Sequence, residues 1–181
     1  MSAKRPIINI DELDLRPWGH GGIPATVAGN SKPREEFQAR LGAIGSRIGA
    51  QKLGYNLTVV PPGKQAFPFH SHYANEEMFY IIEGRGEVRI GEARYPIRAG
   101  DVIACPPGGP ATAHQVINNS DGELKYLVIS TKQTPDVSDY PDSNKFGVLV
   151  ELPPTPEGKP QSQRVIGRWK DSVGYWEDEN G

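Results

Sequence analysis

Short apolar runs, each ended by glycine or proline, are the feature that most limits how this chain can fold. The 181 residues include 21 glycines and 17 prolines, which are spread between these runs instead of forming one low-complexity block. Frequent turn residues leave room for short strands and little room for long helices. Short strands joined by tight turns are typical of a β-sandwich or a β-barrel. We therefore predict an all-β fold with a single core.

Seven segments rich in β-branched and aromatic residues are predicted to be strands. Hairpin turns are expected at Gly84-Arg85-Gly86 and at Gly91-Glu92, because glycine adopts the positive φ of such turns at little cost. The predicted strands cover residues 53–60, 76–83, 87–90, 94–97, 102–105, 113–117 and 124–130.

The strand block divides the chain into three parts. Residues 1–50 are interpreted as an N-terminal arm, residues 51–133 as the barrel core, and residues 134–181 as a C-terminal extension packed on that core. A short helix is expected within residues 34–41 of the arm. Several glycines follow this segment and argue against a longer helix.

The C-terminal extension combines polar, proline-containing segments with large aromatic side chains. Residues 134–144 and 152–160 are predicted to be extended surface connections. Trp169, Tyr175 and Trp176 would be poorly placed on a free tail, so we expect them to pack against the barrel or against a second subunit.

Composition excludes several classes of function. The formal net charge of -2 offers no general cationic surface for a phosphate backbone, so nucleic acid is not expected as a partner. A single cysteine, Cys105, permits no intrachain disulfide and no Cys-rich zinc site. No apolar stretch approaches the roughly 20 residues that span a bilayer, and the N-terminus does not resemble a signal peptide. We predict a cytoplasmic protein with no membrane partner.

Three histidines and a glutamate fall within the strand block at spacings that suit metal binding. In His70-Ser71-His72 the two imidazoles are two residues apart, which places them on the same face of an extended strand. Glu77 begins an apolar run, and alternation places it on the face shared by Phe79 and Ile81. A carboxylate that points into an apolar interior is costly unless a charge or a metal compensates it.

These residues resemble the two motifs of the cupin superfamily. The first motif is matched by Gly63, His70, His72, Glu77 and Gly84, and the second by Gly100, Pro106, Gly108, His114 and Asn118. The spacer from Gly63 to His70 is one residue longer than usual. The spacer from Gly108 to His114 is five residues where two is common, and a loop at residues 107–110 is expected to absorb the insertion.

The resemblance implies a double-stranded β-helix barrel of the cupin, or jelly-roll, type. It also implies one divalent transition-metal ion inside the barrel, bound by His70, His72, Glu77 and His114. Residues 140–148 and the ending Tyr175-Trp176-Glu177 are similar to a group of bacterial single-domain cupins whose biochemical role is mostly unassigned.

Simpler interpretations exist for the same residues. Two histidines that are two residues apart, with no further ligand nearby, are more often ordinary residues of a half-buried strand than metal ligands. Only the matching positions of Glu77 and His114 favour a metal. Strand register decides whether Glu77 faces the interior or the solvent. His114 could instead be a histidine at the barrel mouth, bonded to a loop carbonyl. His20 has no ligand spacing and is expected in a loop, and Cys105 is expected to be a buried structural thiol.

The predicted site leads to two hypotheses about function. Nitrogen and oxygen donors suit iron, manganese, nickel, cobalt or zinc. The first hypothesis is a metal-dependent cupin enzyme, of the dioxygenase, isomerase or decarboxylase type, acting on a small organic acid or sugar-like molecule. The alternative is a non-catalytic cupin that binds or senses a small ligand. The sequence names no catalytic acid or base. A homodimer is expected, because cupin sheets commonly pair.

Overall fold

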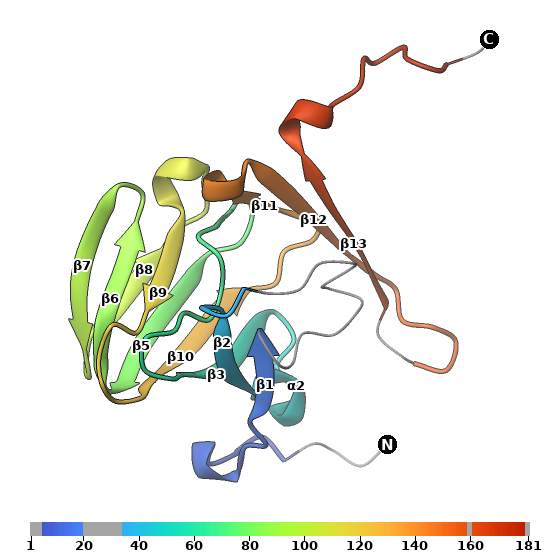
Figure 1. The fold of residues 1–181 in the computed structure, drawn as a ribbon. Helices are drawn as coiled ribbons and strands as arrows, with labels where there is room; N and C mark the ends of the chain where they lie inside the picture. The colour runs from blue at the N-terminus through green and yellow to red at the C-terminus, as the bar shows by residue number, and fades with distance from the viewer. Residues whose placement is uncertain (1–4, 20–33, 159–160, 180–181) are drawn as a thin grey trace.

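The computed structural model describes residues 5–19, 34–158 and 161–179, which fold mainly into β-strands (Figure 1). Helical segments in this part of the chain are short: α2 (Gly45–Ile48) and the 3-10 turns η1 (Ile10–Glu12), η2 (Pro110–Thr112), η3 (Pro141–Ser143) and η4 (Trp169–Asp171). The strands are β1 (Arg16–Gly19), β2 (Gln38–Ala43), β3 (Leu53–Val60), β4 (Ser71–His72), β5 (Glu77–Glu83), β6 (Arg85–Ile90), β7 (Ala93–Arg98), β8 (Val102–Cys105), β9 (His114–Ile117), β10 (Leu124–Thr131), β11 (Asp136–Tyr140), β12 (Lys145–Leu152) and β13 (Gln161–Arg168).

These strands form a jelly-roll β-sandwich. One layer is a six-stranded sheet in the order β1-β2-β3-β10-β5-β8. The other layer combines a three-stranded sheet, β7-β6-β9, with a four-stranded sheet, β13-β12-β11-β4. An isolated bridge between His70 and His114 joins these two smaller sheets. The predicted all-β, jelly-roll class is confirmed.

The seven predicted strands are all present, with ends within two residues of the prediction. A turn is present at both expected positions, but only the one at Gly91 closes a hairpin, between β6 and β7; the hairpin predicted at Gly84 was wrong, because the chain passes there from β5 in the six-stranded sheet to β6 in the three-stranded sheet. Gly84 between β5 and β6 has a φ of 87°, and Gly91 between β6 and β7 has a φ of 55°. Positive φ is the conformation that glycine adopts most readily, so the turn positions are determined by local sequence.

The segment before the core departs from the prediction. The helix expected within residues 34–41 was wrong, because residues 38–43 form β2, which pairs with both β1 and β3. Ala39 on β2 is buried in the core. Pairing and burial therefore outweigh the local helix propensity of this segment. His20 lies outside the described residues.

The main core lies between the two layers. Alternate residues of β5 and β10 point inward, among them Phe79, Ile81 and Tyr126, and they pack against Val88 and Val116 of the opposite layer. At about 25 cal/mol per Å² of buried apolar surface, such side chains supply most of the stabilisation. The outer face of the six-stranded sheet is covered in turn by the N-terminal arm through a second apolar cluster. That cluster contains Ile44, Leu57 and Val59 together with Ile8, Ile10, Leu13 and Leu15.

Residues 134–144 were predicted to be a surface connection, and that prediction was wrong. Five of them form β11, which lies between β4 and β12. Asp136 and Asp139 on this strand are buried, with exposed fractions of 4% and 5%. Both carboxylates have hydrogen-bond partners, Asp136 at His72 and Asp139 at the indole nitrogen of Trp169. A polar segment can be buried when its charged groups are satisfied in this way.

The chain after β11 forms a hairpin of β12 and β13, and the last described residues extend away from the sheets (Figure 1). Trp169 packs on Phe146, with ring centroids 4.6 Å apart. Tyr175 and Trp176 are 84% and 78% exposed in the single chain, so their burial against a second subunit stays a prediction. The boundaries proposed at residues 50 and 133 stay predictions as well. None of the helices in the described residues is long and apolar enough to cross a membrane.

Candidate metal centre

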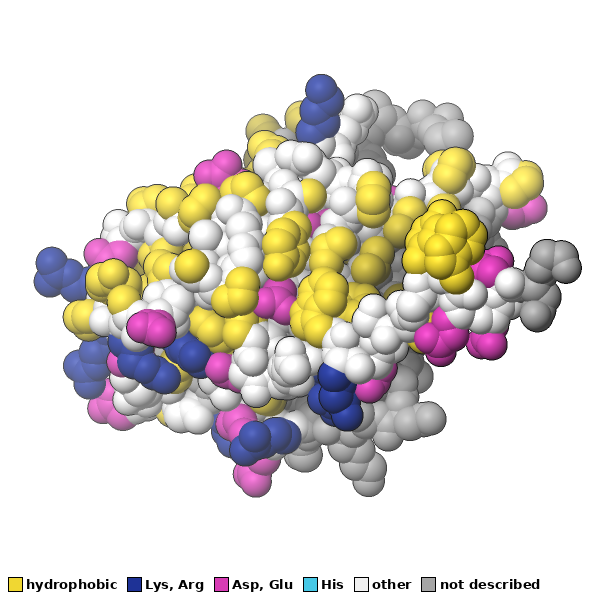
Figure 2. Space-filling view, turned by 90° about the horizontal axis from the view of Figure 1, so that it is seen from above, with side chains coloured by type: hydrophobic (Ala, Val, Ile, Leu, Met, Phe, Trp, Pro, Cys, Tyr) yellow, Lys and Arg dark blue, Asp and Glu magenta, His cyan; other side chains and the backbone are white. Residues whose placement is uncertain are grey.

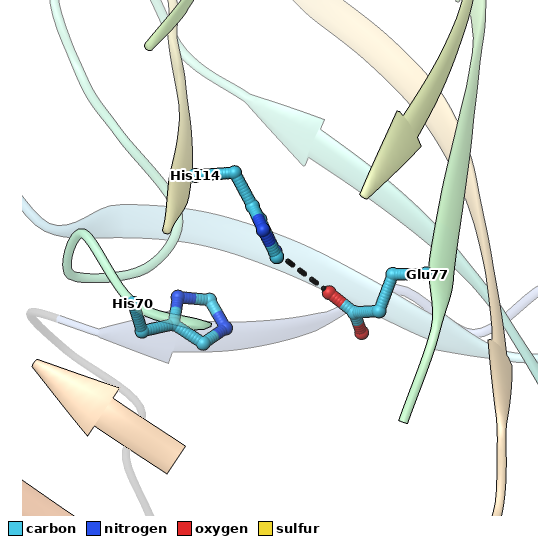
Figure 3. A group of neighbouring side chains, drawn as sticks. All are labelled: His70, Glu77 and His114. Atoms are coloured by element: carbon cyan, nitrogen blue, oxygen red, sulfur yellow. Dashed lines mark hydrogen bonds and ion pairs between the residues drawn. The ribbon is translucent and has the colours of Figure 1, made fainter. Parts of the chain in front are cut away.

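His70, Glu77 and His114 meet between the two layers (Figure 3). His114 begins β9 and exchanges backbone hydrogen bonds with His70, at N–O distances of 2.7 and 3.2 Å. This pairing sets the two imidazoles side by side, with ring centroids 4.9 Å apart. Glu77 begins β5 in the opposite layer and points toward them. The site is therefore assembled by the packing of two sheets.

The potential ligand atoms of His70, Glu77 and His114 all lie within 4.8 Å of one another. His114 Nε2 is 3.0 Å from Glu77 Oε2. His72 lies next to this group of three but is not one of its members, and its Nε2 is 4.0 Å from Glu77 Oε2. Its ring centroid lies 5.0 Å from that of His70. Three of the predicted residues thus form a compact group, and the fourth stands at its edge.

Each imidazole is held by an oxygen atom on its Nδ1 side. His70 Nδ1 is 2.8 Å from the Pro68 carbonyl oxygen, and His114 Nδ1 is 3.3 Å from the Thr112 carbonyl oxygen. His72 Nδ1 is 2.6 Å from Asp136 Oδ2. Because these oxygens accept hydrogen bonds, His70 and His72 donate from Nδ1 and keep the lone pair on Nε2, whereas His114 Nε2 donates to Glu77 Oε2 and would exchange that proton for the metal. Metal-binding histidines are oriented in this manner.

The protonation states also suit metal binding. Burial and the neighbouring charges of His114 and His72 lower the pKa of His70 to about 4, so this imidazole is neutral near pH 7. Burial raises the pKa of Glu77, but the hydrogen bond from His114 and the nearby histidines outweigh burial and lower it overall. A neutral imidazole and an ionised carboxylate are the forms that bind a cation. The donor set fits a divalent transition metal.

The structure bears on the simpler interpretations of two residues. The Glu77 side chain is only 15% exposed and faces His114, so strand register directs it to the interior. His114 is 2% exposed, and the turn η2 takes up the widened spacer before it. Its Nδ1 does contact a loop carbonyl, while its Nε2 faces Glu77. In the face seen in Figure 2, no histidine among the described residues is visible at the surface. The roles of Glu77 and His114 as metal ligands stay a prediction.

Sequence reasoning missed three residues beside the site, all on β11. Asp136 binds His72, Ser138 Oγ lies 3.4 Å from His72 Nδ1, and the Tyr140 ring stacks on His70 with centroids 6.0 Å apart. No ligand spacing links these residues to the histidines. The one available signal was the polar alternation of positions 136, 138 and 140, which is typical of a strand with one polar face. Cys105, by contrast, is a buried thiol as expected.

Comparison with known proteins agrees with this geometry. The cupin domain family matches residues 56–130, which contain all four predicted ligands. Residues 56–130 thus form a cupin domain. An uncharacterized protein of Methanocaldococcus jannaschii is 36% identical to this cupin over 72 residues, which cover 40% of the chain and 54% of that protein. This cupin thus spans about half the length of that relative.

Two solved structures resemble the cupin over more of its length. A putative sugar phosphate isomerase from Acidithiobacillus ferrooxidans has a TM-score of 0.64 at 26% identity, covering 76% of this chain and 80% of its own. A sugar phosphate isomerase from Silicibacter pomeroyi, described as coming from a cupin superfamily, has a TM-score of 0.69 at 22% identity. That match covers 92% of this chain and 95% of the other. Both support the jelly-roll fold.

Proposed function

We propose that this cupin is a metal-dependent enzyme acting on a small sugar-like molecule or organic acid, with isomerisation as the favoured reaction. The observation that carries the proposal is the buried group of His70, Glu77 and His114, whose ligand atoms lie within 4.8 Å of one another. We include His72 as a fourth ligand because its Nε2 is directed toward Glu77. Iron, manganese, nickel, cobalt and zinc all fit these donors.

The choice of isomerisation draws on similarity as well as on the site. A protein described as a putative sugar phosphate isomerase shares 26% identity with this chain over most of its length. A bound divalent ion would act as a Lewis acid toward a carbonyl or hydroxyl oxygen. Polarised oxygens of this kind are required in both isomerisation and decarboxylation of small oxygen-rich molecules.

Residues around the site would position such a substrate. Burial raises the pKa of Tyr140, so its phenol keeps its proton at neutral pH and can donate a hydrogen bond from Oη to a substrate oxygen. Phe79 contacts the His114 ring edge to face, with centroids 5.5 Å apart, and Phe67 lies beside His70. These apolar rings limit the access of water, which strengthens polar contacts within the site.

Elemental analysis of protein purified without added metal tests the site. We expect about one transition-metal ion per chain, and we expect His114→Ala and Glu77→Gln to lose it. Glu76→Gln is the matched control, because Glu76 is the exposed neighbour of Glu77. If the protein holds no ion and takes up none of the five candidate metals on titration, the metalloenzyme proposal is wrong.

Activity is tested with the metal-loaded protein. Aldose phosphates and 2-hydroxy acids are incubated in D2O, and NMR follows deuterium uptake next to the carbonyl, which accompanies isomerisation through an enediol. Oxygen consumption and CO2 release, measured in parallel, identify dioxygenase or decarboxylase activity. Tight binding of a compound without turnover in all three assays would favour the alternative, a cupin that binds or senses a small ligand.

A further inference from the structure

One face of the four-stranded sheet continues from the candidate metal centre to the edge of the molecule. Directly opposed residues in neighbouring strands point to the same face. His72 opposes Ser138, which opposes Gly147, which opposes Ile166. The face that carries His72 on β4 therefore extends across β11 and β12 to β13.

Three cations lie on this face, in the rows on either side of Gly147. Tyr140, which stacks on His70, opposes Lys145, and Lys145 opposes Arg168. In the other row Asp136, which binds His72, opposes Leu149, and Leu149 opposes Arg164. Both rows thus begin at a residue that contacts a histidine of the site and end at an arginine. We call Lys145, Arg164 and Arg168 the cationic face.

No carboxylate among the described residues neutralises the cationic face. Lys145, Arg164 and Arg168 take part in none of the ion pairs formed within residues 5–19, 34–158 and 161–179. Arg168 Nη1 donates to the Ser143 carbonyl oxygen at 3.3 Å. The carboxylates that share this side of the sheet are already engaged: Asp136 binds His72, and Glu151 pairs with Lys132 at 3.5 Å.

The cationic face is close enough to the site for one small molecule to contact both. Lys145 Nζ lies 5.7 Å from the centre of the Tyr140 ring, which itself stacks on His70. Two strand steps, or about 10 Å, separate the backbone of β4 from that of β12, which carries Lys145, and three steps, or about 14 Å, separate it from that of β13, which carries the two arginines. Long lysine and arginine side chains shorten this gap.

We propose that the cationic face binds the phosphate or carboxylate group of a small substrate whose other oxygen atoms reach the His–Glu site. The proposal rests on the proposed function and names its substrate class, an anionic sugar or sugar acid. Arginine is suited to this role because its planar guanidinium binds an anionic oxygen group through two hydrogen bonds. A neutral sugar would leave three positive charges without a partner.

Three five-carbon probes test the proposal by isothermal titration: D-ribose, D-ribonate and D-ribose 5-phosphate. They differ mainly in being neutral, carboxylated or phosphorylated. We expect the metal-loaded protein to bind at least one anion at least tenfold more tightly than ribose, and this preference to weaken as ionic strength rises. The stronger of the two anions identifies whether the cationic face accepts a phosphate or a carboxylate.

Substitutions then assign the preference to named residues. Arg164→Gln and Arg168→Gln should each weaken anion binding on the order of tenfold, with ribose binding unchanged. Arg164→Lys should weaken anion binding less than Arg164→Gln, because it keeps the positive charge. Arg85→Gln is the charge-matched control, because Arg85 is an exposed arginine on β6 that pairs with Asp121. Thermal unfolding of each variant checks that the fold is retained.

The outcomes separate this inference from the proposed function. Equal affinity for the three probes, no binding at millimolar concentration, or the same affinity in Arg164→Gln as in Arg85→Gln would overturn the anion site. The metal content is measured in the same samples, so a failure to bind metal is recognised separately from a failure to bind the anion. The titrations are also repeated on metal-free protein. An anion preference that persists there and is lost in Arg164→Gln supports the cationic face even if the protein proves to hold no metal.

Discussion

Removing the carboxylate of Asp136 should weaken metal binding although Asp136 is not itself a predicted ligand. Its Oδ2 accepts a hydrogen bond from His72 Nδ1 at 2.6 Å, and its Oδ1 accepts one from the backbone nitrogen of Ala74 at 3.1 Å. The first contact keeps the proton on Nδ1 and the lone pair on Nε2. In Asp136→Asn the charge is lost, and the amide NH2 can face Nδ1, which moves the imidazole proton to Nε2 and blocks coordination there.

The magnitude follows from the role of such contacts in metal sites. Loss of a hydrogen-bond partner behind a metal-binding histidine typically weakens metal affinity by about tenfold to a hundredfold. This corresponds to about 1.4 to 2.7 kcal/mol of binding free energy. Asp136 is 4% exposed, so water cannot readily replace its carboxylate. We therefore expect a loss within this range, with His70, Glu77 and His114 still able to hold the ion.

Competition with a chromophoric chelator measures the affinity, and the d–d absorption of the Co(II)-loaded protein reports whether the coordination changes. Asp139→Asn is the matched control. Asp139 lies on the same strand with a similar burial, but it points to the other face and bonds to Trp169 Nε1 at 3.0 Å. Equal metal affinity and identical Co(II) spectra in the two variants would refute the reasoning and remove His72 from the ligand set.

Three further predictions concern other parts of the molecule. The pKa of His70 falls from 6.5 to about 4 on folding, so the unfolded chain binds more protons between these values, and the metal-free protein should lose up to about 3 kcal/mol of stability as pH falls from 6.5 to 4. His70→Gln should flatten this decline in denaturant titrations at several pH values, and an unchanged slope would contradict it. Burial raises the pKa of the Cys105 thiol to about 12, so a thiol reagent should label the native protein far more slowly than the unfolded one. Rapid labelling at the same rate in both states would argue against a buried thiol. Gly84→Ala should destabilise by about 2 to 4 kcal/mol, because a Cβ at φ 87° would collide with the Glu123 carbonyl oxygen, whereas Gly100→Ala, at φ 95° with open space, should cost only about 1 kcal/mol. Equal melting temperatures for the two alanine variants would show that the collision has no effect.

Much of the strand pattern and of the candidate site could be predicted from local sequence. The period of two along a strand placed His70 and His72 on one face and set Glu77 beside Phe79 and Ile81. Those placements do not depend on which strands pair. The turns at Gly84 and Gly91 were equally local, because positive φ strongly favours one residue type.

Contacts between segments far apart in the chain could not be predicted in this way. Residues 38–43 form a strand only because β1 and β3 pair with it, and no local signal outweighed the helical propensity of the segment. His72 and Asp136 are separated by 64 positions, and β11 brings them together by pairing with β4. Sequence alone thus determined which residues could share a strand face. Only the tertiary structure decided which faces meet, because strand pairing and sheet packing depend on the burial of the whole chain.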